Sequence, residues 1–324
     1  MSIKLGIVGT NFISDWLLDA AGRVDGIEVS AVCSRSQETG QAFAEKHGIK
    51  HAHTDYQVFL KSDIDAVYIA TPTFAHCPQA LAAMNHKKHV LCEKIIAVNE
   101  AEVRTMIECA KANQVVLLEA MRPDFDPAYE LVMQNLDKIG TLRKVTLDFS
   151  QYSSRYDKFR EGEVLNAFNP ELSNAAIMDI GVYCIHTLVK LFGMPKAVKA
   201  FSNILHNGFE GSGIVLMQYG GMVAEAVYSK ISDAVSPSVF QGEDGSIVVR
   251  GVSHVSSMEI IYRNGRKEAI PYVAPENNMV CELDMFRRLI QDRQVVHPYL
   301  EYSMNTLKVT DEARRQNGIV FQAD

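Results

Sequence analysis

The sequence lacks long apolar runs, an excess of positive charge and an export signal, and each of these shortages excludes a class of protein. Among its 324 residues, no uninterrupted apolar run approaches the roughly 20 residues of a membrane-spanning helix. The first ten residues, MSIKLGIVGT, lack the charged and long apolar regions of a secretory signal. The net charge is −7 and the basic residues are scattered, whereas nucleic acid requires a concentrated positive surface. We therefore expect a cytoplasmic protein that binds neither membranes nor nucleic acid.

Cysteine is also scarce, and the six residues are too dispersed for a zinc signature. They lie within patterns typical of strands or helices, where a reduced cysteine behaves as a small apolar residue. A disulfide framework is not expected in a chain of this length without an export signal. We predict no metal site, and we predict reduced thiols at Cys33, Cys77, Cys92, Cys109, Cys184 and Cys281.

What the sequence does contain is a regular alternation of apolar runs and helical patterns over its first 120 or so residues. This alternation predicts a doubly wound parallel sheet, the Rossmann arrangement of the α/β class. From about residue 141 the apolar period changes to two, which predicts an α+β domain with a mostly antiparallel sheet. We place the two domains at residues 1–120 and 121–324, and we expect the last helix to pack back on the first domain.

Residues 66–96 form the centre of the predicted site, because they read as a strand, a helix and a second strand, with polar residues after each strand. In an open parallel sheet, ligands bind outside the carboxyl ends of the strands, so both polar ends reach one crevice. Lys94 is the catalytic candidate there. The alternative is that Glu93 and Lys94 form only a solvated strand end. The predicted cofactor contacts from this stretch are Thr71, Pro72, Thr73, His76, Glu93 and Lys94.

A dinucleotide-binding turn is predicted after the first strand, residues 3–8, where the chain reads GTNFIS before a helical pattern. In the fingerprint G-x-G-x-x-G, the glycines make a tight turn, let the backbone approach a pyrophosphate and allow close helix packing. Here Gly9, Asn11 and Ser14 hold these positions. Asparagine tolerates a left-handed backbone well, and serine is small. The context favours a nucleotide cradle over a plain turn, formed by Gly9, Thr10, Asn11, Phe12 and Ile13.

The second strand, residues 27–33, ends at Ser34, Arg35 and Ser36. At this distance from the glycine turn, an NAD-binding protein usually carries an acidic residue for the ribose 2′-hydroxyl. A guanidinium instead pairs with phosphate through a planar donor fork, and serine adds short hydrogen bonds. The set therefore favours NADP(H). NAD(H) is the cofactor if Arg35 is only an exposed loop charge.

The second domain is predicted to carry site residues on one long helix, residues 175–192, and in the loop 151–173 before it. Asp179 and Tyr183 are four residues apart and His186 follows after three, so all three project from nearly one face. These groups are costly inside a core unless they are hydrogen-bonded or meet a cleft. The alternatives are a capping or salt-bridged aspartate, a core tyrosine and a satisfied core histidine. Arg122 is a further candidate substrate contact. In the loop, the candidates are Arg155, Tyr156 and Asp157, and the alternative is a loop that is only solvated.

The order of these motifs resembles a known family of NAD(P)-dependent oxidoreductases. A glycine turn is followed by IATPTFAH, by HVLCEKI and, in the second domain, by MDIGVYCIH. Together they look like the glucose-fructose oxidoreductase, inositol dehydrogenase and MocA (Gfo/Idh/MocA) family, with most similarity to the branch that contains dimeric dihydrodiol dehydrogenase. The resemblance covers nearly the whole chain. It implies a Rossmann domain, an open sheet carrying the substrate pocket, and a homodimer or homotetramer often formed through the outer face of that sheet.

By this resemblance, Lys94 occupies the family's catalytic lysine position, and Asp179 and Tyr183 match its aspartate and its histidine or tyrosine. The implied reaction is hydride transfer between a nicotinamide and a carbinol or carbonyl carbon of a sugar, polyol or cyclic diol. Lys94 is the expected general acid and base. Tyr183 is the alternative proton donor, and Asp179 holds a substrate hydroxyl or orients the lysine. A nucleotide-sensing regulatory protein without turnover is the rival hypothesis, and retention of all three residues argues against it.

Four departures from the family pattern bear on these expectations. The family usually has a proline where this chain has Ile95, and glycines where it has Asn11 and Lys87. The glycine-rich run before the catalytic helix has become residues 174–176, Asn-Ala-Ala. We expect the side chains added at residues 174–176 to leave less room for a substrate to approach the backbone. Of the four departures, this one should therefore have the largest effect on the substrate class.

Overall fold

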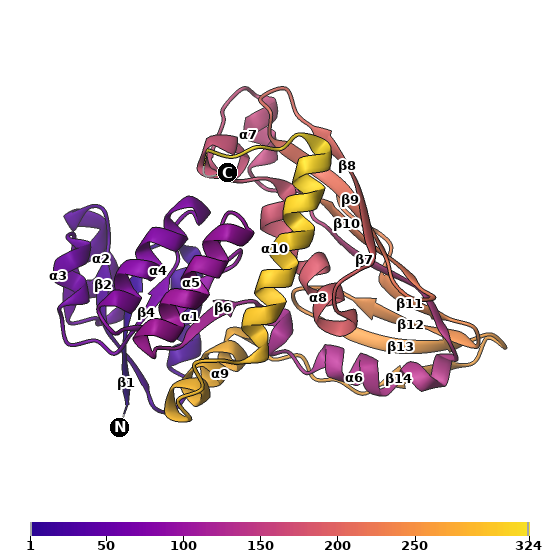
Figure 1. The fold of residues 1–324 in the computed structure, drawn as a ribbon, viewed down its shortest axis with the longest axis horizontal. Helices are drawn as coiled ribbons and strands as arrows, with labels where there is room; N and C mark the ends of the chain where they lie inside the picture. Colours follow the sequence, from indigo (N-terminus) through magenta and orange to yellow (C-terminus); the bar gives the residue numbers. More distant parts are fainter. Residues whose placement is uncertain (1, 323) are drawn as a thin grey trace. The chain divides into compact units, whose positions relative to one another are not determined.

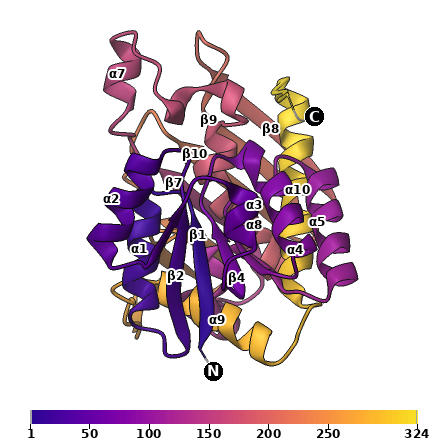
Figure 2. The same ribbon diagram turned by 90° about the vertical axis from the view of Figure 1, so that its left-hand side faces the viewer.

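The structure, a computed structural model, describes residues 2–322 and 324. Its chain divides into two compact units, and their ribbons are drawn in Figure 1 and Figure 2. Unit 1 comprises the chain up to Phe125 together with Glu276–Ser303, and unit 2 comprises Asp126–Pro275 and Met304–Asp324. The segment 276–303, which the sequence analysis assigned to the second domain, is thus part of the first compact unit.

Unit 1 is built on a six-stranded sheet with the order β3-β2-β1-β4-β5-β6. Every neighbouring pair is parallel, so the carboxyl ends of the strands lie along one edge. The strand order reverses between β1 and β4, which is where doubly wound sheets bind ligands. The predicted Rossmann sheet is confirmed. Its strands are β1 Ile3–Val8, β2 Ile27–Cys33, β3 His51–His53, β4 Ala66–Ile69, β5 His89–Glu93 and β6 Leu117–Ala120.

The helices of unit 1 begin and end at residues that the local sequence explains. Asp55 caps α3, because its carboxylate accepts hydrogen bonds from the N–H groups of Gln57 and Val58 at 2.7 and 3.0 Å. Gly48 ends α2 in the left-handed conformation, and Lys87 adopts it after α4 with φ 59°. The helices are α1 Phe12–Ala21, α2 Gln37–His47, α3 Tyr56–Leu60, α4 His76–Asn85, α5 Glu100–Asn113 and α9 Met279–Gln291.

Helix α9 joins unit 1 because its apolar face is buried in the core of that unit. It packs against α1, and a helix of this kind owes most of its stability to such a buried face. The same core contains apolar residues from β1, β4 and β6. The buried residues that α9 contributes are Met279, Leu283, Phe286 and Leu289.

Unit 2 is built on an eight-stranded sheet with the order β14-β13-β12-β11-β7-β10-β9-β8. Strands β7 and β10 pair in parallel, and the other neighbouring pairs are antiparallel, so the predicted mostly antiparallel sheet is confirmed. Strands β11 and β14 were not expected from the sequence. The strands are β7 Leu142–Ser150, β8 Ala197–Ile204, β9 Glu210–Gln218, β10 Val223–Ser229, β11 Ser238–Gly242, β12 Gly245–Arg250, β13 Ser257–Tyr262 and β14 Lys267–Ile270.

The helices of unit 2 differ from the prediction in two places. The loop 151–173 contains a short helix, and the helix expected over residues 175–192 opens with a π-helical turn, Ile177–Gly181. The continuous segment Pro170–Phe192 is long and apolar enough to span a membrane by length and composition alone. Most of it is buried inside the protein, as in the core helix of a globular domain, so this is weak evidence for a span. The helices are α6 Ala128–Gln134, α7 Tyr156–Arg160, α8 Val182–Phe192 and α10 Pro298–Asn317, whose first residues belong to unit 1.

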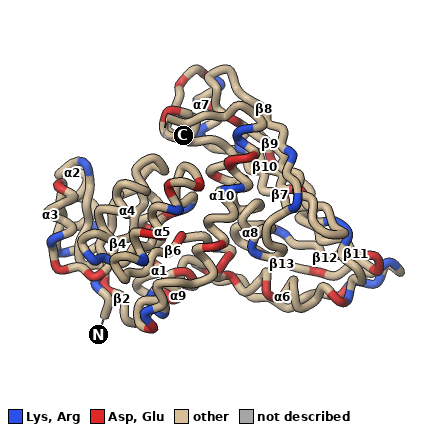
Figure 3. Tube along the Cα trace, in the orientation of Figure 1, with Lys and Arg blue, Asp and Glu red and all other residues tan. Residues whose placement is uncertain are grey.

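Charges of both signs and free thiols occur in both units. Lys and Arg are interspersed with Asp and Glu in both units (Figure 3). All six cysteines are free thiols, and burial raises the pKa of Cys33 and of Cys77 to about 11. Within residues 2–322 and 324, no group of three or more His, Cys, Asp or Glu is arranged to hold a metal ion. Because a thiolate is the reactive form of cysteine, these two buried thiols are structural.

Candidate active site

The turn between β1 and α1 is held at the carboxyl edge of the sheet. Gly9 has φ 106°, and a Cβ at this position would lie 2.4 Å from the carbonyl oxygen of Ala70. Its N–H donates to the carbonyl oxygen of Cys33 at 3.0 Å. Only glycine satisfies both the backbone angle and this close approach, so the geometry requires glycine at the first fingerprint position.

Asn11 retains the turn for a different reason from the one expected. Its backbone is extended, with φ −90°, and is not left-handed. Its side-chain oxygen caps α1 by accepting from the N–H groups of Ile13 and Ser14 at 3.1 and 3.3 Å. The side-chain amide donates to Ala70 O at 2.9 Å, and the Ser14 hydroxyl donates to Gly9 O at 2.9 Å. The side chains of Asn11 and Ser14, which replace two glycines of the fingerprint, therefore hold the turn in place through hydrogen bonds.

Three backbone donors in this turn have no partner within the described chain. The N–H groups of Thr10, Asn11 and Phe12 donate to no residue among 2–322 and 324. They lie at the N-terminus of a ten-residue helix, where backbone donors and the helix dipole both favour an anion. The arrangement fits a pyrophosphate.

The three polar residues after β2 have separate roles. Ser34 is buried, and its hydroxyl lies 2.7 Å from the Thr39 hydroxyl. Ser36 is exposed and caps α2 by accepting from the Thr39 N–H at 3.4 Å. Arg35 is exposed between them, at the N-terminus of α2. Of the predicted set, Arg35 and Ser36 are accessible to a ligand, whereas Ser34 positions the loop.

His76 joins the loops that follow β4 and β5. Its ring is buried, with one nitrogen 2.7 Å from Thr71 O and the other 2.9 Å from Ile95 O. Burial lowers the pKa of His76 and the charge of Lys94 lowers it further, while the backbone contacts oppose this. Thr71 also bonds Gln79 through its hydroxyl, and the loop contains an exposed Pro72 and a half-buried Thr73. His76, predicted to contact the cofactor, thus fixes the two loops.

Lys94 follows β5 on a backbone that is fixed on both sides. Its N–H donates to Glu93 Oε2 at 3.3 Å, and the peptide bond between Lys94 and Ile95 is cis. Two residues further on, the Ile96 N–H donates to the buried carboxylate of Glu119 at 2.9 Å. Glu119 also accepts from the Ser303 hydroxyl at 2.5 Å. Glu119, which the sequence analysis did not single out, thus holds the loop that presents the lysine.

Glu93 and Glu282 are two carboxyl groups of unit 1 that interact electrostatically. Glu93 accepts a hydrogen bond from the Tyr68 hydroxyl. Burial raises the pKa of Glu93, while the Tyr68 bond and the charges of Lys94 and Arg122 act in the opposite direction. Glu282 on α9 is fully buried (0% exposed), and neither carboxylate oxygen has a hydrogen-bond partner among the described residues.

The pKa of Glu282 is raised well above its ordinary value of 4.5 by burial, and the charge of Glu93 raises it further. The positive charge of Arg122 opposes this shift. Arg122, predicted to contact substrate, therefore lies where it acts as a counter-charge to this pair. Burial and the charge of Glu93 both favour the protonated form of Glu282. Glu282 lies on the apolar face of α9. An acidic residue on the apolar face of a helix is the sequence feature that could have identified Glu282 as an unusual buried carboxyl group.

In unit 2, the π-helical turn that carries Asp179 is shaped by residues from two strands. The Ile177 N–H donates to the carboxylate of Glu210 on β9 at 2.7 Å. The Tyr228 hydroxyl on β10 donates to the same carboxylate at 2.9 Å. Burial raises the pKa of Glu210, and these hydrogen bonds lower it. π-Helical turns are frequent at functional sites, and here the turn presents a half-exposed carboxylate.

The three residues expected on one helix face have different environments. Asp179 is 38% exposed and forms an ion pair with Lys230 at 2.8 Å, a residue that the sequence analysis did not identify. Tyr183 is buried, and its ring packs 5.5 Å from that of Phe149. His186 is fully buried, with Nδ1 3.1 Å from the Thr306 hydroxyl on α10. This environment is that of the satisfied core histidine, which was the alternative to a substrate contact.

Tyr156 belongs to an aromatic cluster formed with the loop 151–173. Its ring stacks on those of Phe159 and Phe168 at centroid distances of 5.9 and 5.4 Å. Phe209 completes the cluster, 5.0 Å from Phe168. The loop is therefore packed on its own apolar core, and Tyr156 contributes to that packing.

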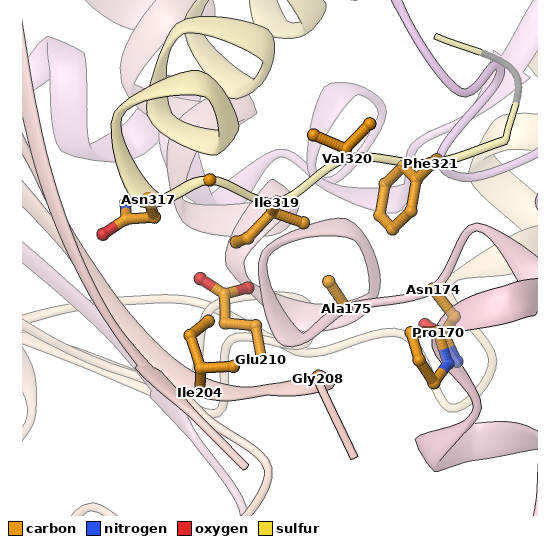
Figure 4. A pocket seen from close by; sticks show the side chains of 11 residues that line it. Pro170, Asn174, Ala175, Ile204, Gly208, Glu210, Asn317, Ile319, Val320 and Phe321 are labelled. Carbon is orange, nitrogen blue, oxygen red and sulfur yellow. The ribbon is translucent and has the colours of Figure 1, made fainter. Parts of the chain in front are cut away.

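A pocket of about 230 Å³ lies within unit 2 (Figure 4). The C-terminal segment lines one side, and Asn174 and Ala175, at the family's usual glycine-rich run, line another. None of the predicted catalytic residues lines it. Two of the residues that replace the family's glycine-rich run, Asn174 and Ala175, therefore contribute side chains to the wall of this pocket. The lining residues are Pro170, Asn174, Ala175, Ile204, Gly208, Glu210, Asn317, Gly318, Ile319, Val320 and Phe321.

With this geometry established, comparison with known proteins assigns the chain to a class. One family model, an oxidoreductase family with an NAD-binding Rossmann fold, matches residues 3–121, and the GFO/IDH/MocA C-terminal domain matches residues 133–248. The scyllo-inositol 2-dehydrogenase (NADP(+)) IolU of Bacillus subtilis (strain 168) is 47% identical over 325 residues, covering 99% of each chain. The protein belongs to the GFO/IDH/MocA family of oxidoreductases, as predicted.

More distant relatives agree with this assignment. The trans-1,2-dihydrobenzene-1,2-diol dehydrogenase of Danio rerio is 29% identical, covering 92% of this chain and 91% of its own. The crystal structure of KijD10, a 3-ketoreductase from Actinomadura kijaniata in complex with NADP and TDP-benzene, superposes with a TM-score of 0.85 over 98% of each chain. At 20% identity, that likeness concerns the fold alone.

Proposed function

We propose that this protein is an NADP(H)-dependent dehydrogenase that oxidises one secondary alcohol of a cyclic polyol, with an inositol as the first candidate. The observation that carries the proposal is the 47% identity to scyllo-inositol 2-dehydrogenase (NADP(+)) over 99% of both chains. Such an alignment spans both the nucleotide turn of unit 1 and the π-helical turn of unit 2. The cofactor region and the substrate region are therefore both included in the similarity.

Preference for NADP(H) is supported by the residues at the start of α2. Arg35 and Ser36 are exposed at this helix N-terminus, where an anion gains from the helix dipole and from the arginine fork. A ribose 2′-phosphate matches these donors, whereas a free 2′-hydroxyl matches an acidic residue. The N–H groups of residues 10–12 would hold the pyrophosphate. When bound, the nicotinamide supplies the hydride chemistry.

Lys94 is the proposed general base in oxidation and general acid in reduction. When the alcohol is oxidised, its hydroxyl proton passes to Nζ of Lys94, and in the reverse direction the ammonium returns that proton to the carbonyl oxygen. The carboxylates of Glu93 and Glu119 fix the backbone on either side of this lysine. A side chain that starts from a fixed backbone loses less freedom when it reaches the reacting oxygen.

Asp179 is proposed to accept a hydrogen bond from a second substrate hydroxyl. An ionised carboxylate only accepts hydrogen bonds, so it favours a ligand with several hydroxyl donors, as in a polyol. Its half-exposed position on the π-helical turn supports this role. Tyr183 is the alternative proton donor, and its ring packs against that of Phe149.

Sugars and cyclic diols are the alternative substrates in the same proposal. The similarity to a dihydrodiol dehydrogenase at 29% identity supports the diol. We also propose a cytoplasmic location and a homodimer or homotetramer, in line with the family resemblance.

The experiment has two stages. Equilibrium binding of NADPH and NADH is followed through the fluorescence of Trp16, the only tryptophan, which is 49% exposed on α1. Oxidation of inositol stereoisomers, sugars and cyclic diols is then measured with each nucleotide. Tighter binding of NADPH and turnover of an inositol are expected. Nucleotide binding without turnover of any of these alcohols would overturn the dehydrogenase, and failure to bind either nucleotide would remove the cofactor from the proposal.

A further inference from the structure

Lys230, directly after β10, is a lysine with a buried ammonium group. Its side chain is 5% exposed. The Nζ atom lies 2.8 Å from Asp179 Oδ2 and 2.8 Å from the carbonyl oxygen of Ala167. It also lies 5.1 Å from the ring centroid of Phe168 and 5.2 Å from that of Phe209. One carboxylate, one carbonyl and two aromatic faces therefore surround this charge.

These contacts compensate for the loss of hydration when the ammonium group is buried. An ammonium has three N–H donors and no acceptor, and burying it without compensation is costly. The Asp179 carboxylate and the Ala167 carbonyl each take one donor. The aromatic faces stabilise the cation further, since a cation within about 6 Å of a ring centroid is attracted by the ring quadrupole. With its surroundings filled by protein groups, Lys230 is not placed to exchange a proton with a substrate.

The backbone of Lys230 is anchored as firmly as its side chain. Its N–H donates to Gly211 O at 2.8 Å, and its carbonyl accepts from the Ser153 N–H at 2.9 Å. Ser153 and Ala167 both lie in the loop 151–173, so this one residue holds the loop at two places. A small displacement of Lys230 would move both that loop and the carboxylate of Asp179.

We propose that Lys230 is a positioning residue for the dehydrogenase: it keeps the Asp179 carboxylate ionised and oriented to accept substrate hydroxyls, and it fixes the loop 151–173 in the same arrangement. This inference rests on the proposed function, because it concerns the hydroxyl-binding role of Asp179. It assigns a further specificity-determining residue, which acts through Asp179 and does not touch the substrate.

The test removes the charge and keeps most of the length of the side chain. In Lys230→Met, kcat/KM for the best polyol should fall about 10- to 100-fold, as expected when a supporting group around a reacting centre is lost. The acid side of the pH profile should move to higher pH, because a carboxylate without its cation is protonated more readily. Lys230→Arg, which keeps the charge, should recover part of the activity. Binding of NADPH should stay within about threefold, because the nucleotide turn is built from other residues.

Two further variants make the test specific. Lys144→Met removes the ammonium of another ion pair on the same sheet, 2.7 Å from Glu225, and should leave the pH profile unchanged. In an Asp179→Asn background, Lys230→Met should add little further loss, because two residues that act as one unit are not additive. An equal shift of the pH profile in Lys144→Met, or an additive loss in the double variant, would overturn the positioning role.

The remaining outcomes separate this inference from the function on which it rests. If Asp179→Asn abolishes turnover while Lys230→Met retains the wild-type pH profile and kcat/KM, the inference fails and the dehydrogenase stands. If wild-type protein turns over no polyol, sugar or diol, both fail. Reduced thermal stability of Lys230→Met with wild-type kcat/KM and pH profile would assign the lysine a structural role only and would also overturn the inference.

Discussion

The ring of Tyr228 lies directly against the backbone of Gly181, so that a Cβ on this glycine would come within 2.8 Å of the ring. Tyr228 is itself buried and bonded to Glu210, so its ring has little room to move. The glycine in the segment MDIGVYCIH is thus explained by packing on β10. The contact matters for the site because Gly181 ends the π-helical turn that carries Asp179.

Gly181→Ala is predicted to destabilise the protein and impair the site together. Overpacking of a filled core typically costs about 1–3 kcal/mol in the free energy of unfolding. Because the turn must shift to make room, kcat/KM should fall more than the loss of folded protein explains. Denaturant unfolding and steady-state kinetics measure the two effects. Gly22→Ala is the control, since a Cβ there meets only ordinary contacts at 3.5 and 3.7 Å, and equal effects of both variants would contradict this prediction.

Lys94→Met is predicted to lower kcat far more than it weakens nucleotide binding. General acid-base catalysis contributes about 10²- to 10⁴-fold, so a loss in this range is expected. The dissociation constant for NADPH should change by less than about threefold, because the phosphate cradle is formed by residues 9–14. Lys61→Met, which removes an exposed lysine at the end of α3, is the matched control. Near-wild-type turnover in Lys94→Met would end the assignment of this lysine.

Arg35→Asp is predicted to change the nucleotide preference. A hydrogen bond to a charged group contributes about 1.5–3 kcal/mol, so the affinity for NADPH should fall roughly 10- to 100-fold or more. The affinity for NADH should change little, because aspartate can accept from the ribose 2′-hydroxyl. Fluorescence titration measures both constants. Arg104→Asp on α5 makes the same change in net charge away from the turn, and parallel losses in the two variants would indicate a general electrostatic effect.

Glu282→Gln is predicted to stabilise the protein increasingly as pH rises. The folded state raises the pKa of Glu282 well above the 4.5 of the unfolded chain. The stabilisation that this group contributes is therefore fully present below about pH 4.5. It is lost as pH rises, because the unfolded chain releases the proton while the folded chain retains it. Glutamine resembles the protonated acid and does not titrate. The free energy of unfolding of the variant, relative to wild type, should therefore grow from about pH 5 to about pH 8.

Urea unfolding across this pH range measures the difference. Glu312→Gln is the control of opposite sign, because hydrogen bonds from Arg315 and Gln316 lower the pKa of this partly exposed carboxyl to about 2. That variant should lose a stabilising ionised group and show no growing gain with pH. A pH-independent difference between wild type and Glu282→Gln would mean that Glu282 does not carry a retained proton in the folded protein.

The architecture of unit 1 could be predicted from local sequence to a large extent. The bounds expected for β1 and β2, residues 3–8 and 27–33, agree with the structure. Continuous apolar runs mark strands that are buried on both faces, and caps such as Asp55 and Gly48 mark helix ends. These signals act between residues close in the chain, so no knowledge of tertiary contacts is needed to recognise them.

Strands β11 and β14 and the π-helical turn could not be predicted in this way. The two strands are short, at five and four residues, and each is specified by the neighbour it pairs with. The turn depends on Glu210 and Tyr228, which are distant in sequence from Ile177. The period of 3.6 residues therefore did not reveal that Asp179 is partly exposed while Tyr183 and His186 are buried.

For the site, the order of motifs alone was sufficient to identify Lys94 and Asp179 as candidates and to predict the family. The tertiary structure decided what supports them. Lys230 became visible only as the partner of Asp179, because ion pairing and an aromatic environment are assembled from separate strands and loops. Glu282 lies in unit 1 because α9 returns to that core. Burial and long-range pairing are properties of the folded chain, and they determine which polar residues keep their charge and which lose it.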